Sequence, residues 1–369
     1  MQPAFSAADH EFMARALRLA ERGLLTTTPN PRVGCVIVRD RQVVGEGWHV
    51  RAGGPHAEVH ALREAGDKAR GATAFVTLEP CSHHGRTPPC AETLLAAGVH
   101  RVVAAIEDPN PLVAGRGLAA LRQAGVRAEC GLLADAAREL NIGFVSRMTR
   151  GRPWLRLKLA ASLDGKTALC NGASQWLTGP AARQDGHRWR ARACAILTGS
   201  GSVRADDPQL NVRGIAELPT EIVRQPLRIV VDSRLEVSPD ARVLQGGGTL
   251  VVAAVTDRAR SAALAELGVE VLLLPGSDGR VDLRALLAEL ARRGINELHV
   301  EAGFVLSGAL LQAGLVDELL LYLAPCLVGD LARGMFALPQ LESLAGRKQL
   351  LIRDVRLLSQ DLRLLARFS

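Results

Sequence analysis

Apolar positions in the first 150 residues switch between a helical period and strand-like runs. In residues 9–22, Phe12, Ala16 and Leu19 recur at helical spacing, which predicts an amphipathic helix. Residues 32–47, RVGCVIVRDRQVVGEG, are typical of two strands joined by a charged turn. The same signals predict further strands in 72–80, 99–109 and 126–131, and helices in 55–66, 91–98, 115–125 and 132–148.

The second half of the chain continues this alternation. Strands are predicted in 154–162, 193–200, 227–233, 249–256, 269–274, 297–303 and 318–325, and helices in 282–294 and 305–314. Residues 215–227 and 245–249 are rich in turn formers and are expected to be loops. Strands that alternate with helices in this way predict an α/β fold, with sheets covered on both faces.

A basic stretch followed by glycine and proline, RMTRGRP at 147–153, separates the two halves. The chain has 369 residues, and domains commonly hold roughly 100–200 residues. We therefore predict two domains, residues 1–148 and 149–369.

Composition places the protein among ordinary globular chains, with 48% hydrophobic and 22% charged residues. No apolar run approaches the ~20 residues that span a bilayer, and the N-terminal residues do not resemble a secretory signal. The seven cysteines are an odd number and are scattered along the chain, which favours a reducing compartment. We expect a cytoplasmic protein without a membrane partner.

The net charge is +7, but basic residues are dispersed and aromatic residues make up only 3%. Few side chains could therefore stack on bases. This pattern suits an anionic small molecule better than a nucleic acid, so we expect no nucleic-acid partner.

Three side chains in the first half have the donor types of a catalytic zinc site. His56 stands at a predicted helix start, Cys81 follows a predicted strand and Pro80, and Cys90 opens the next helix. One nitrogen and two sulfurs would leave a fourth position for water. Glu58 follows His56 by two residues, where it can stand beside the metal and carry a proton from water to a leaving amine.

Each of these residues alone would most often be structural. Together, H-x-E followed by P-C and a second Cys is the signature of zinc nucleobase deaminases. His60 lies one turn after His56, but the metalloprotease pattern needs Glu directly after the first His, and Ala57 stands there. We therefore interpret His60 as structural and expect one zinc per chain.

The loop between the two cysteines is longer than usual. Eight residues separate them, where deaminases usually have two, and the insertion carries His83, His84 and Arg86. Cationic donors beside the metal would suit a substrate phosphate. The alternative interpretation is a solvated loop.

Motifs along nearly the whole chain resemble those of the bifunctional riboflavin-biosynthesis deaminase–reductases. The resembling segments are TPNPRVGCVIV (28–38), GEGWHVRAGGPHAEVHAL (45–62), TLEPCSHHGRTPPC (77–90), EDPNPLVAGRG (107–117), LKLAASLDGKTA (157–168), SQWLTG (174–179), RADDPQLNVR (204–213), VDS (231–233) and EAGFVLSGALL (301–311). The resemblance implies an N-terminal cytidine-deaminase-like α/β/α domain with zinc and a C-terminal dihydrofolate-reductase-like α/β domain.

The resemblance also implies two successive reactions. 2,5-Diamino-6-(ribosylamino)-4(3H)-pyrimidinone 5'-phosphate would lose its ring amine by hydrolysis, and NADPH would then reduce the ribosyl group to ribityl. In the deaminase, the resemblance gives His56, Cys81 and Cys90 as zinc ligands, Glu58 as the proton shuttle and Asn30 and His49 as pocket residues. His83 and Arg86 are implied for the phosphate.

The second half lacks the dinucleotide fingerprint G-x-G-x-x-G, because TGSGSVR (198–204) has no third glycine. The turn before 305–314 offers a helix N-terminus to a pyrophosphate instead. By resemblance, NADP contacts are Ala160, Trp176, Ser202, Asp206, Ser233, Gly303, Phe304, Val305, Leu306, Ser307, Gly308 and Ala309, although Phe304 is bulky for such a turn. Substrate contacts implied in the same way are Lys158, Ser174, Arg190, Leu210, Arg213 and Glu301.

Two alternatives compete with this enzyme. A nucleic-acid deaminase would be expected to have the short Cys spacing and an aromatic-lined basic channel. A zinc-stabilised scaffold would have a fourth protein ligand and no use for Glu58. For the enzyme, we expect a small-molecule substrate and a homo-oligomer.

Overall fold

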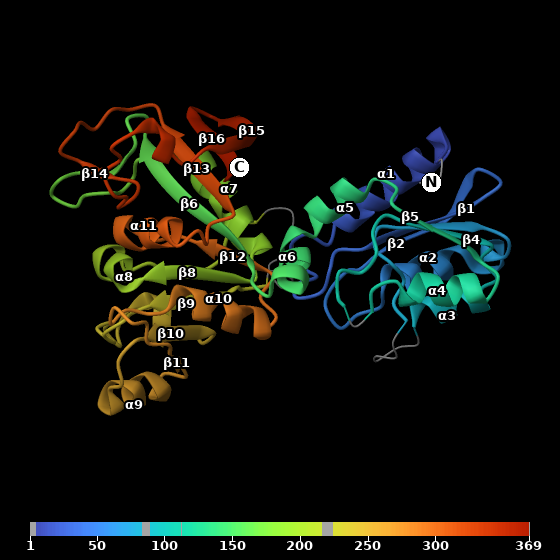
Figure 1. Cartoon of the computed structure of the whole chain (residues 1–369), viewed down its shortest axis with the longest axis horizontal. Helices are drawn as coiled ribbons and strands as arrows, with labels where there is room; N and C mark the ends of the chain where they lie inside the picture. Colours follow the sequence, from blue (N-terminus) through green and yellow to red (C-terminus); the bar gives the residue numbers. More distant parts are fainter. Residues whose placement is uncertain (1–4, 83–88, 112, 216–223, 369) are drawn as a thin grey trace. The chain divides into compact units, whose positions relative to one another are not determined.

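The computed structural model describes residues 5–82, 89–111, 113–215 and 224–368. The chain forms two compact units, Met1–Gly151 and Arg152–Ser369 (Figure 1). The division lies three residues beyond the predicted end of the first domain at 148. No described helix has the length and apolar character needed to cross a membrane.

The first unit is built on a five-stranded sheet with the strand order β2-β1-β3-β4-β5. β1 pairs antiparallel with β2 and β3, whereas β3, β4 and β5 run parallel. The strands are β1 (Gly34–Arg39), β2 (Gln42–Trp48), β3 (Thr73–Val76), β4 (Arg101–Ala104) and β5 (Arg127–Cys130). The parallel strands end at one edge of the sheet, which is where α/β proteins generally bind ligands.

Helices cover both faces of this sheet, as predicted. Alternation along β1 divides the core: Cys35 and Ile37 pack with α2, α3 and α4, whereas Val36 and Val38 pack with α1, α5 and α6. The helices are α1 (Ala7–Glu21), α2 (Ala57–Ala65), α3 (Cys90–Ala96), α4 (Arg116–Gln123), α5 (Ala134–Leu140) and α6 (Ile142–Arg150), with a short 3₁₀ helix η1 (Gly66–Ala69).

One predicted helix, 132–148, is two helices in the structure. α5 ends at Leu140 and α6 begins at Ile142, with Asn141 between them at φ −108° and ψ 24°. The Asn141 side chain accepts the N–H of Arg32 at 2.8 Å and donates to the Arg32 carbonyl at 2.9 Å. This long-range pairing fixes the break, so apolar periodicity could not reveal it.

The second unit contains a nine-stranded sheet with the order β11-β10-β9-β8-β12-β6-β13-β16-β15. In this order, the first seven strands, from β11 across to β13, run parallel to one another. β16 pairs antiparallel with β13, and β15 pairs antiparallel with β16. The strands are β6 (Trp154–Ser162), β8 (Ala195–Gly199), β9 (Leu227–Val231), β10 (Thr249–Ala253), β11 (Glu270–Leu273), β12 (Glu297–Val300), β13 (Glu318–Ala324), β15 (Leu350–Leu358) and β16 (Asp361–Phe368). A separate small sheet pairs β7 (Lys166–Ala168) with β14 (Arg333–Gly334).

The helices of this unit are α7 (Pro180–Arg192), α8 (Ser200–Asp206), α9 (Arg258–Glu266), α10 (Leu283–Arg292) and α11 (Phe304–Gln312), with 3₁₀ turns η3 (Arg242–Leu244) and η4 (Leu344–Gly346). The sequence patterns did not predict α7, although it is the longest of them. Its buried face carries a charge: Asp185 accepts hydrogen bonds from Tyr322 at 2.7 Å and from Arg363 at 3.1 Å. A polar core face leaves no apolar period to detect.

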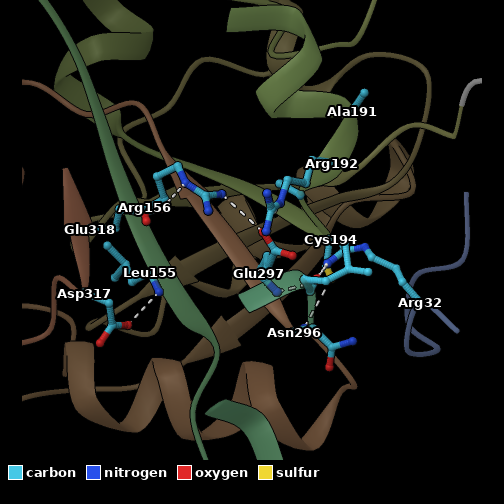
Figure 2. Close-up of polar contacts among 12 residues, drawn as sticks. Arg32, Leu155, Arg156, Ala191, Arg192, Cys194, Asn296, Glu297, Asp317 and Glu318 are labelled. Carbon is cyan, nitrogen blue, oxygen red and sulfur yellow. Dashed lines mark hydrogen bonds and ion pairs between the residues drawn. The ribbon is translucent and has the colours of Figure 1, made fainter. Parts of the chain in front are cut away.

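A buried ionic network joins three central strands of the second unit (Figure 2). Arg156 on β6 contacts Glu318 on β13 at 2.5 Å and Glu297 on β12 at 3.2 Å. Two further arginines join the network: Arg192 at the end of α7 lies 2.7 Å from Glu297, and Arg367 on β16 lies 2.9 Å from Glu318. Burial alone would raise the pKa of Glu318, but Arg156 and Arg367 hold it below the usual value.

We predict that Arg156→Met destabilises the second unit by about 3–5 kcal/mol, because it leaves buried carboxylates without their central cation. Urea unfolding followed by tryptophan fluorescence measures this, since three of the four tryptophans, Trp154, Trp176 and Trp189, lie in this unit. Arg234→Met is the matched control, because it removes an exposed pair with Glu236. Equal unfolding midpoints for the two variants would contradict the prediction.

Candidate metal centre and cofactor cleft

Close packing of α2 on β2 places the first two candidate residues. A Cβ atom on Gly47 would lie 2.2 Å from the Ala57 carbonyl oxygen, and one on Gly45 would lie 2.2 Å from that of Ala61. Glycine is therefore needed for the helix to approach the strand. His56 is the N-cap of α2, and Glu58 lies in its first turn.

His56, Cys81 and Cys90 converge, with their ligand atoms all within 4.8 Å of one another. His56 Nδ1 lies 3.2 Å from Cys90 Sγ and 3.6 Å from Cys81 Sγ. A tetrahedral zinc with ordinary Zn–N and Zn–S bonds would place these atoms about 3.6 Å apart. Among the residues that the structure describes, no fourth His, Cys, Asp or Glu joins the group. The donor types and spacing therefore fit zinc with one position left open.

Cys81 lies beyond the end of β3, and Cys90 is the first residue of α3. The Cys90 N–H points to Cys81 Sγ at 3.3 Å, and the Ala91 N–H donates to the Cys81 carbonyl at 3.2 Å. Hydrogen bonding from the Cys90 thiol, assisted by His56 and opposed by burial, lowers the pKa of Cys81 to about 4. A lowered pKa favours the thiolate, the form that binds metals.

Glu58 lies beside these donors and outside the ligand group. Its side chain is buried, and burial raises the pKa of its carboxyl, whereas its own backbone N–H and His56 favour the charged form. A carboxyl with a raised pKa exchanges a proton more readily near neutral pH, as a proton shuttle requires.

Asn30 and His49 meet next to His56. Pro55 O accepts a hydrogen bond from His49 Nδ1 at 3.0 Å, so Nε2 is left to accept one from Asn30 Nδ2, also at 3.0 Å. The His49 and His56 rings lie edge to face with centroids 5.6 Å apart. Burial lowers the pKa of His49, which favours the neutral ring. The other two predicted pocket residues, His83 and Arg86, lie outside the described residues.

A cleft of about 1010 Å³ lies in the second unit, at the ends of parallel strands β8, β9 and β12 and beside residues 158–160 of β6. Nine of the predicted cofactor contacts line it: Ala160, Ser202, Asp206, Ser233, Gly303, Phe304, Val305, Leu306 and Ala309. Helix α11 opens into this cleft with Gly303 as its N-cap and no side-chain cap. Free backbone N–H groups at a helix start suit a pyrophosphate, so the cleft fits a dinucleotide cofactor.

Three predicted cofactor residues lie elsewhere. Ser307 is fully buried and its hydroxyl donates to the Ala302 carbonyl at 3.1 Å. A Cβ atom on Gly308 would lie 2.3 Å from the Ala337 carbonyl oxygen, so this residue faces a packed loop. Trp176 is 68% exposed and lines a neighbouring cavity.

That neighbouring cavity, of about 530 Å³, shares Lys158, Arg190 and Glu301 with the cofactor cleft. Arg213 lines only the smaller cavity, whereas Ser174 and Leu210 line only the cleft. All six predicted substrate contacts of this unit thus lie along two adjoining spaces.

Glu301 is the electrostatic centre of that junction. Its carboxylate binds Arg190 through two contacts of 2.5 and 2.9 Å and lies 3.8 Å from Lys158 Nζ and 3.3 Å from His299 Nε2. Burial alone would raise the pKa of Glu301, but Arg190 and Lys158 hold it well below the usual range. Burial also lowers the pKa of Lys158.

The sequence analysis missed several residues that line the smaller cavity. His187, Arg183 and Tyr322 face the smaller cavity, and burial near Arg190 and Arg213 lowers the pKa of His187 to about 4. His187 and Arg183 belong to α7, which apolar patterning did not detect. Tyr322 is the one tyrosine in the sequence and interrupts an otherwise aliphatic strand, a signal that could have been used.

Comparison with known proteins identifies the families of both halves of the chain. Residues 6–106 match the cytidine and deoxycytidylate deaminase zinc-binding region, and residues 153–363 match the RibD C-terminal domain. The riboflavin biosynthesis protein RibD of Escherichia coli is 53% identical over 360 residues, which cover 96% of this chain and 97% of that protein. The RibD of Haemophilus influenzae is 47% identical over a stretch that covers 98% of this chain and 97% of that protein.

Solved structures give the same result. Acinetobacter baumannii RibD superposes with a TM-score of 0.92 at 47% identity, covering 98% of this chain and 99% of that one. A Thermotoga maritima protein described as a diaminohydroxyphosphoribosylaminopyrimidine deaminase/5-amino-6-(5-phosphoribosylamino)uracil reductase superposes with a TM-score of 0.85 at 31% identity, with the same coverage.

The expected fold is confirmed: a cytidine-deaminase-like unit precedes a dihydrofolate-reductase-like unit. The expected cofactors are confirmed as well, since the deaminase unit is of the zinc-binding kind and the reductase is of the NADPH-dependent kind. The chain belongs to the RibD family of bifunctional riboflavin-biosynthesis enzymes, which combine a deaminase and a reductase.

Proposed function

We propose that residues 1–148 hydrolyse the ring amine of 2,5-diamino-6-(ribosylamino)-4(3H)-pyrimidinone 5'-phosphate, and that residues 149–369 reduce the ribosyl group of the product to ribityl with NADPH. The observation that carries the first half is the convergence of His56, Cys81 and Cys90 beside a buried Glu58. The observation that carries the second is the cleft at α11 with its charged junction.

In the proposed deaminase, His56, Cys81 and Cys90 would hold zinc, which would supply a Lewis acid that makes water a nucleophile near neutral pH. Glu58 would take a proton from the water whose oxygen bonds to the ring carbon, and would deliver it to the exocyclic amino nitrogen. The bond between that carbon and the amino nitrogen then breaks, and ammonia leaves. The buried setting of Glu58 suits this cycle, because burial brings the free energies of its charged and protonated forms closer together.

Asn30 and His49 act as pocket residues in this proposal. The hydrogen bond from His49 Nδ1 to Pro55 fixes the orientation of the ring against His56. Because both ring nitrogens of His49 are engaged, Nδ1 with the Pro55 carbonyl and Nε2 with Asn30, it is poorly placed to replace Glu58 as the base. His83 and Arg86 remain proposed phosphate contacts.

In the proposed reductase, the cofactor occupies the larger cleft, along the nine predicted contacts that line it. The ribosyl group lies where this cleft joins the smaller cavity. Glu301 fixes Arg190 in one plane, and Arg190 Nη1 also donates to the Asn211 carbonyl at 3.1 Å. Within the described residues, these three bonds leave two of the five guanidinium N–H groups for a substrate. Arg213 and Arg190 are suited to its phosphate, and Lys158 to its sugar hydroxyls.

The proposed division of labour predicts that residues 152–369 form a working reductase alone. Both cavities and the junction residues lie entirely within this unit. The fragment is expected to oxidise NADPH at a rate comparable to that of the full chain when it is given the deaminated substrate. A folded fragment that binds NADPH but does not turn over would contradict the assignment.

Two substitutions separate a zinc ligand from a proton shuttle. Cys81→Ser is expected to lose zinc and deamination, because it removes one of three ligands. Glu58→Gln is expected to keep zinc but to lose ~10²–10⁴-fold or more in deamination, because Gln cannot carry the proton. Elemental analysis and ammonia release from the same preparations measure both effects.

NADPH oxidation by both variants serves as the control and is expected to be normal. Zinc retained in Cys81→Ser would contradict the ligand set. Zinc lost from Glu58→Gln would make Glu58 a ligand, and near-normal deamination would place the base elsewhere.

We further propose that the enzyme works in the cytoplasm as a homo-oligomer, with no nucleic-acid or membrane partner. One face of the edge strand β15 supports self-association. Leu350, Ile352, Val355 and Leu357 pair with alternate residues of β16, from Phe368 to Leu362, so they share a face. They are 37–70% exposed. Such an apolar edge favours pairing with a second copy of this chain.

Val355→Glu combined with Leu357→Glu is predicted to reduce the native mass to that of the 39.3 kDa monomer. Light scattering after gel filtration measures the mass. Arg353→Glu, on the same exposed strand, is the control and is expected to leave the assembly intact. An unchanged mass in the double variant, or a wild-type protein that is monomeric, would contradict the proposal.

A further inference from the structure

Glu79 is a buried carboxylate that the proposed reactions do not use, and it lies two residues before Cys81. Glu79 is only 5% exposed, and each of its carboxylate oxygens accepts hydrogen bonds from two backbone N–H groups of a distant segment. The donors are Asp108 (3.0 Å) and Gly115 (2.9 Å) to Oε2, and Gly117 (2.7 Å) and Leu118 (3.1 Å) to Oε1.

These contacts make Glu79 the N-terminal cap of α4. The N-cap residue, Gly115, has a left-handed φ of 75° and no side chain, so α4 provides no cap of its own. A carboxylate is a strong acceptor for helix N-terminal amides, because its charge adds to each hydrogen bond and complements the helix dipole. The first turn of α4 is thereby attached to the chain that leaves β3.

A second contact brings the same turn onto the backbone next to Cys81. A Cβ atom on Gly117 would lie 1.9 Å from the Pro80 carbonyl oxygen and 3.2 Å from Glu79 Oε1. The Pro80 carbonyl belongs to the peptide bond that joins Pro80 to Cys81. Helix α4 therefore packs directly on the peptide that carries the metal-ligand candidate.

The other side of this segment is held by the sheet. The Glu79 N–H donates to the Ile106 carbonyl at 2.9 Å, which continues the pairing of β3 with β4 past the last assigned residues. The backbone before Cys81 is thus confined between a strand and a helix, and the Glu79 side chain connects the two.

We propose that Glu79 is a positioning residue of the deaminase. By capping α4 and holding its first turn against Pro80, it sets where Cys81 Sγ lies relative to His56 Nδ1 and Cys90 Sγ. Groups that orient metal ligands commonly change metal affinity by ~10–100-fold when they are altered. The inference rests on the proposed zinc site and adds a determinant of its affinity that lies outside the ligand set.

Glutamine at position 79 isolates this role. It has nearly the shape of glutamate, but its amide NH₂ would replace one oxygen and face two backbone N–H groups. In either orientation of the amide, two of the four donors lose their acceptor. The first turn of α4 is then expected to move away, and the Pro80–Cys81 peptide is released with it.

The experiment compares Glu79→Gln with Glu64→Gln in the full-length enzyme. The control carboxylate also accepts a backbone N–H, that of Glu46 at 2.8 Å, but it is exposed at the far end of α2. Competition with a chromophoric chelator gives the zinc dissociation constant. Glu79→Gln is expected to bind zinc ~10–100-fold more weakly, with ammonia release partly restored by excess zinc. Glu64→Gln is expected to match wild type.

NADPH oxidation by Glu79→Gln reports that the second unit is intact and is expected to be normal. Zinc affinity equal to wild type in a folded Glu79→Gln enzyme would overturn the inference while leaving the metal site standing. Failure of wild type itself to bind zinc would contradict the proposed metal site instead.

A measurement on the wild-type enzyme covers the case in which Glu79→Gln does not fold. Coupling between two sites is reciprocal. If the α4 cap strengthens zinc binding, bound zinc should in turn slow hydrogen exchange at the backbone amides that donate to Glu79. Removal of zinc is expected to speed hydrogen exchange at Gly117 and Leu118 more than within α1. Equal exchange with and without zinc, or a uniform change across the unit, would overturn the inference.

Discussion

Three donor atoms from separate segments must meet within a few ångströms before the first unit can have any chemistry. His56 and Cys90 are 34 residues apart, and no local structure could bring them together. β3 pairs parallel with β4, and the segment after β3 carries Cys81. Glycines in β2 allow α2, which begins after His56, to pack closely on the sheet. Cys90 is the first residue of α3. The rest of the unit is the framework that holds these three donor atoms close together.

The second unit meets a different constraint, the cost of burying charge. Arg156 with Glu297 and Glu318 lies deep in the sheet, and Arg190 with Glu301 lies where the two cavities join. The centre of the first network is almost fully buried, and we interpret it as structural. The second faces open space, so the same kind of ion pair keeps a carboxylate charged and an arginine oriented for a ligand.

Carboxylates in the two units show how burial directs function. Glu58 has few opposing charges, so burial raises its pKa towards that of a proton carrier. Glu301 lines two cavities, and two cations keep its pKa low and favour its anionic form. Glu79 accepts hydrogen bonds from four backbone N–H groups and caps a helix. The environment, and not the residue type, assigns these three tasks.

The sequence alone determined the α/β class and most strands, and it predicted the zinc donors with Glu58, because period and motif spacing are local properties of the chain. It predicted the cofactor turn at 303 with the help of the family resemblance. It did not reveal α7, the break at Asn141 or the cap at Glu79, because each depends on a polar partner far away in the chain. Nor could it show that Ser307 and Gly308 face away from the cleft while neighbouring residues of α11 line it. Which side of a helix meets a ligand is decided by what packs on the other side, and only the tertiary structure contains that information.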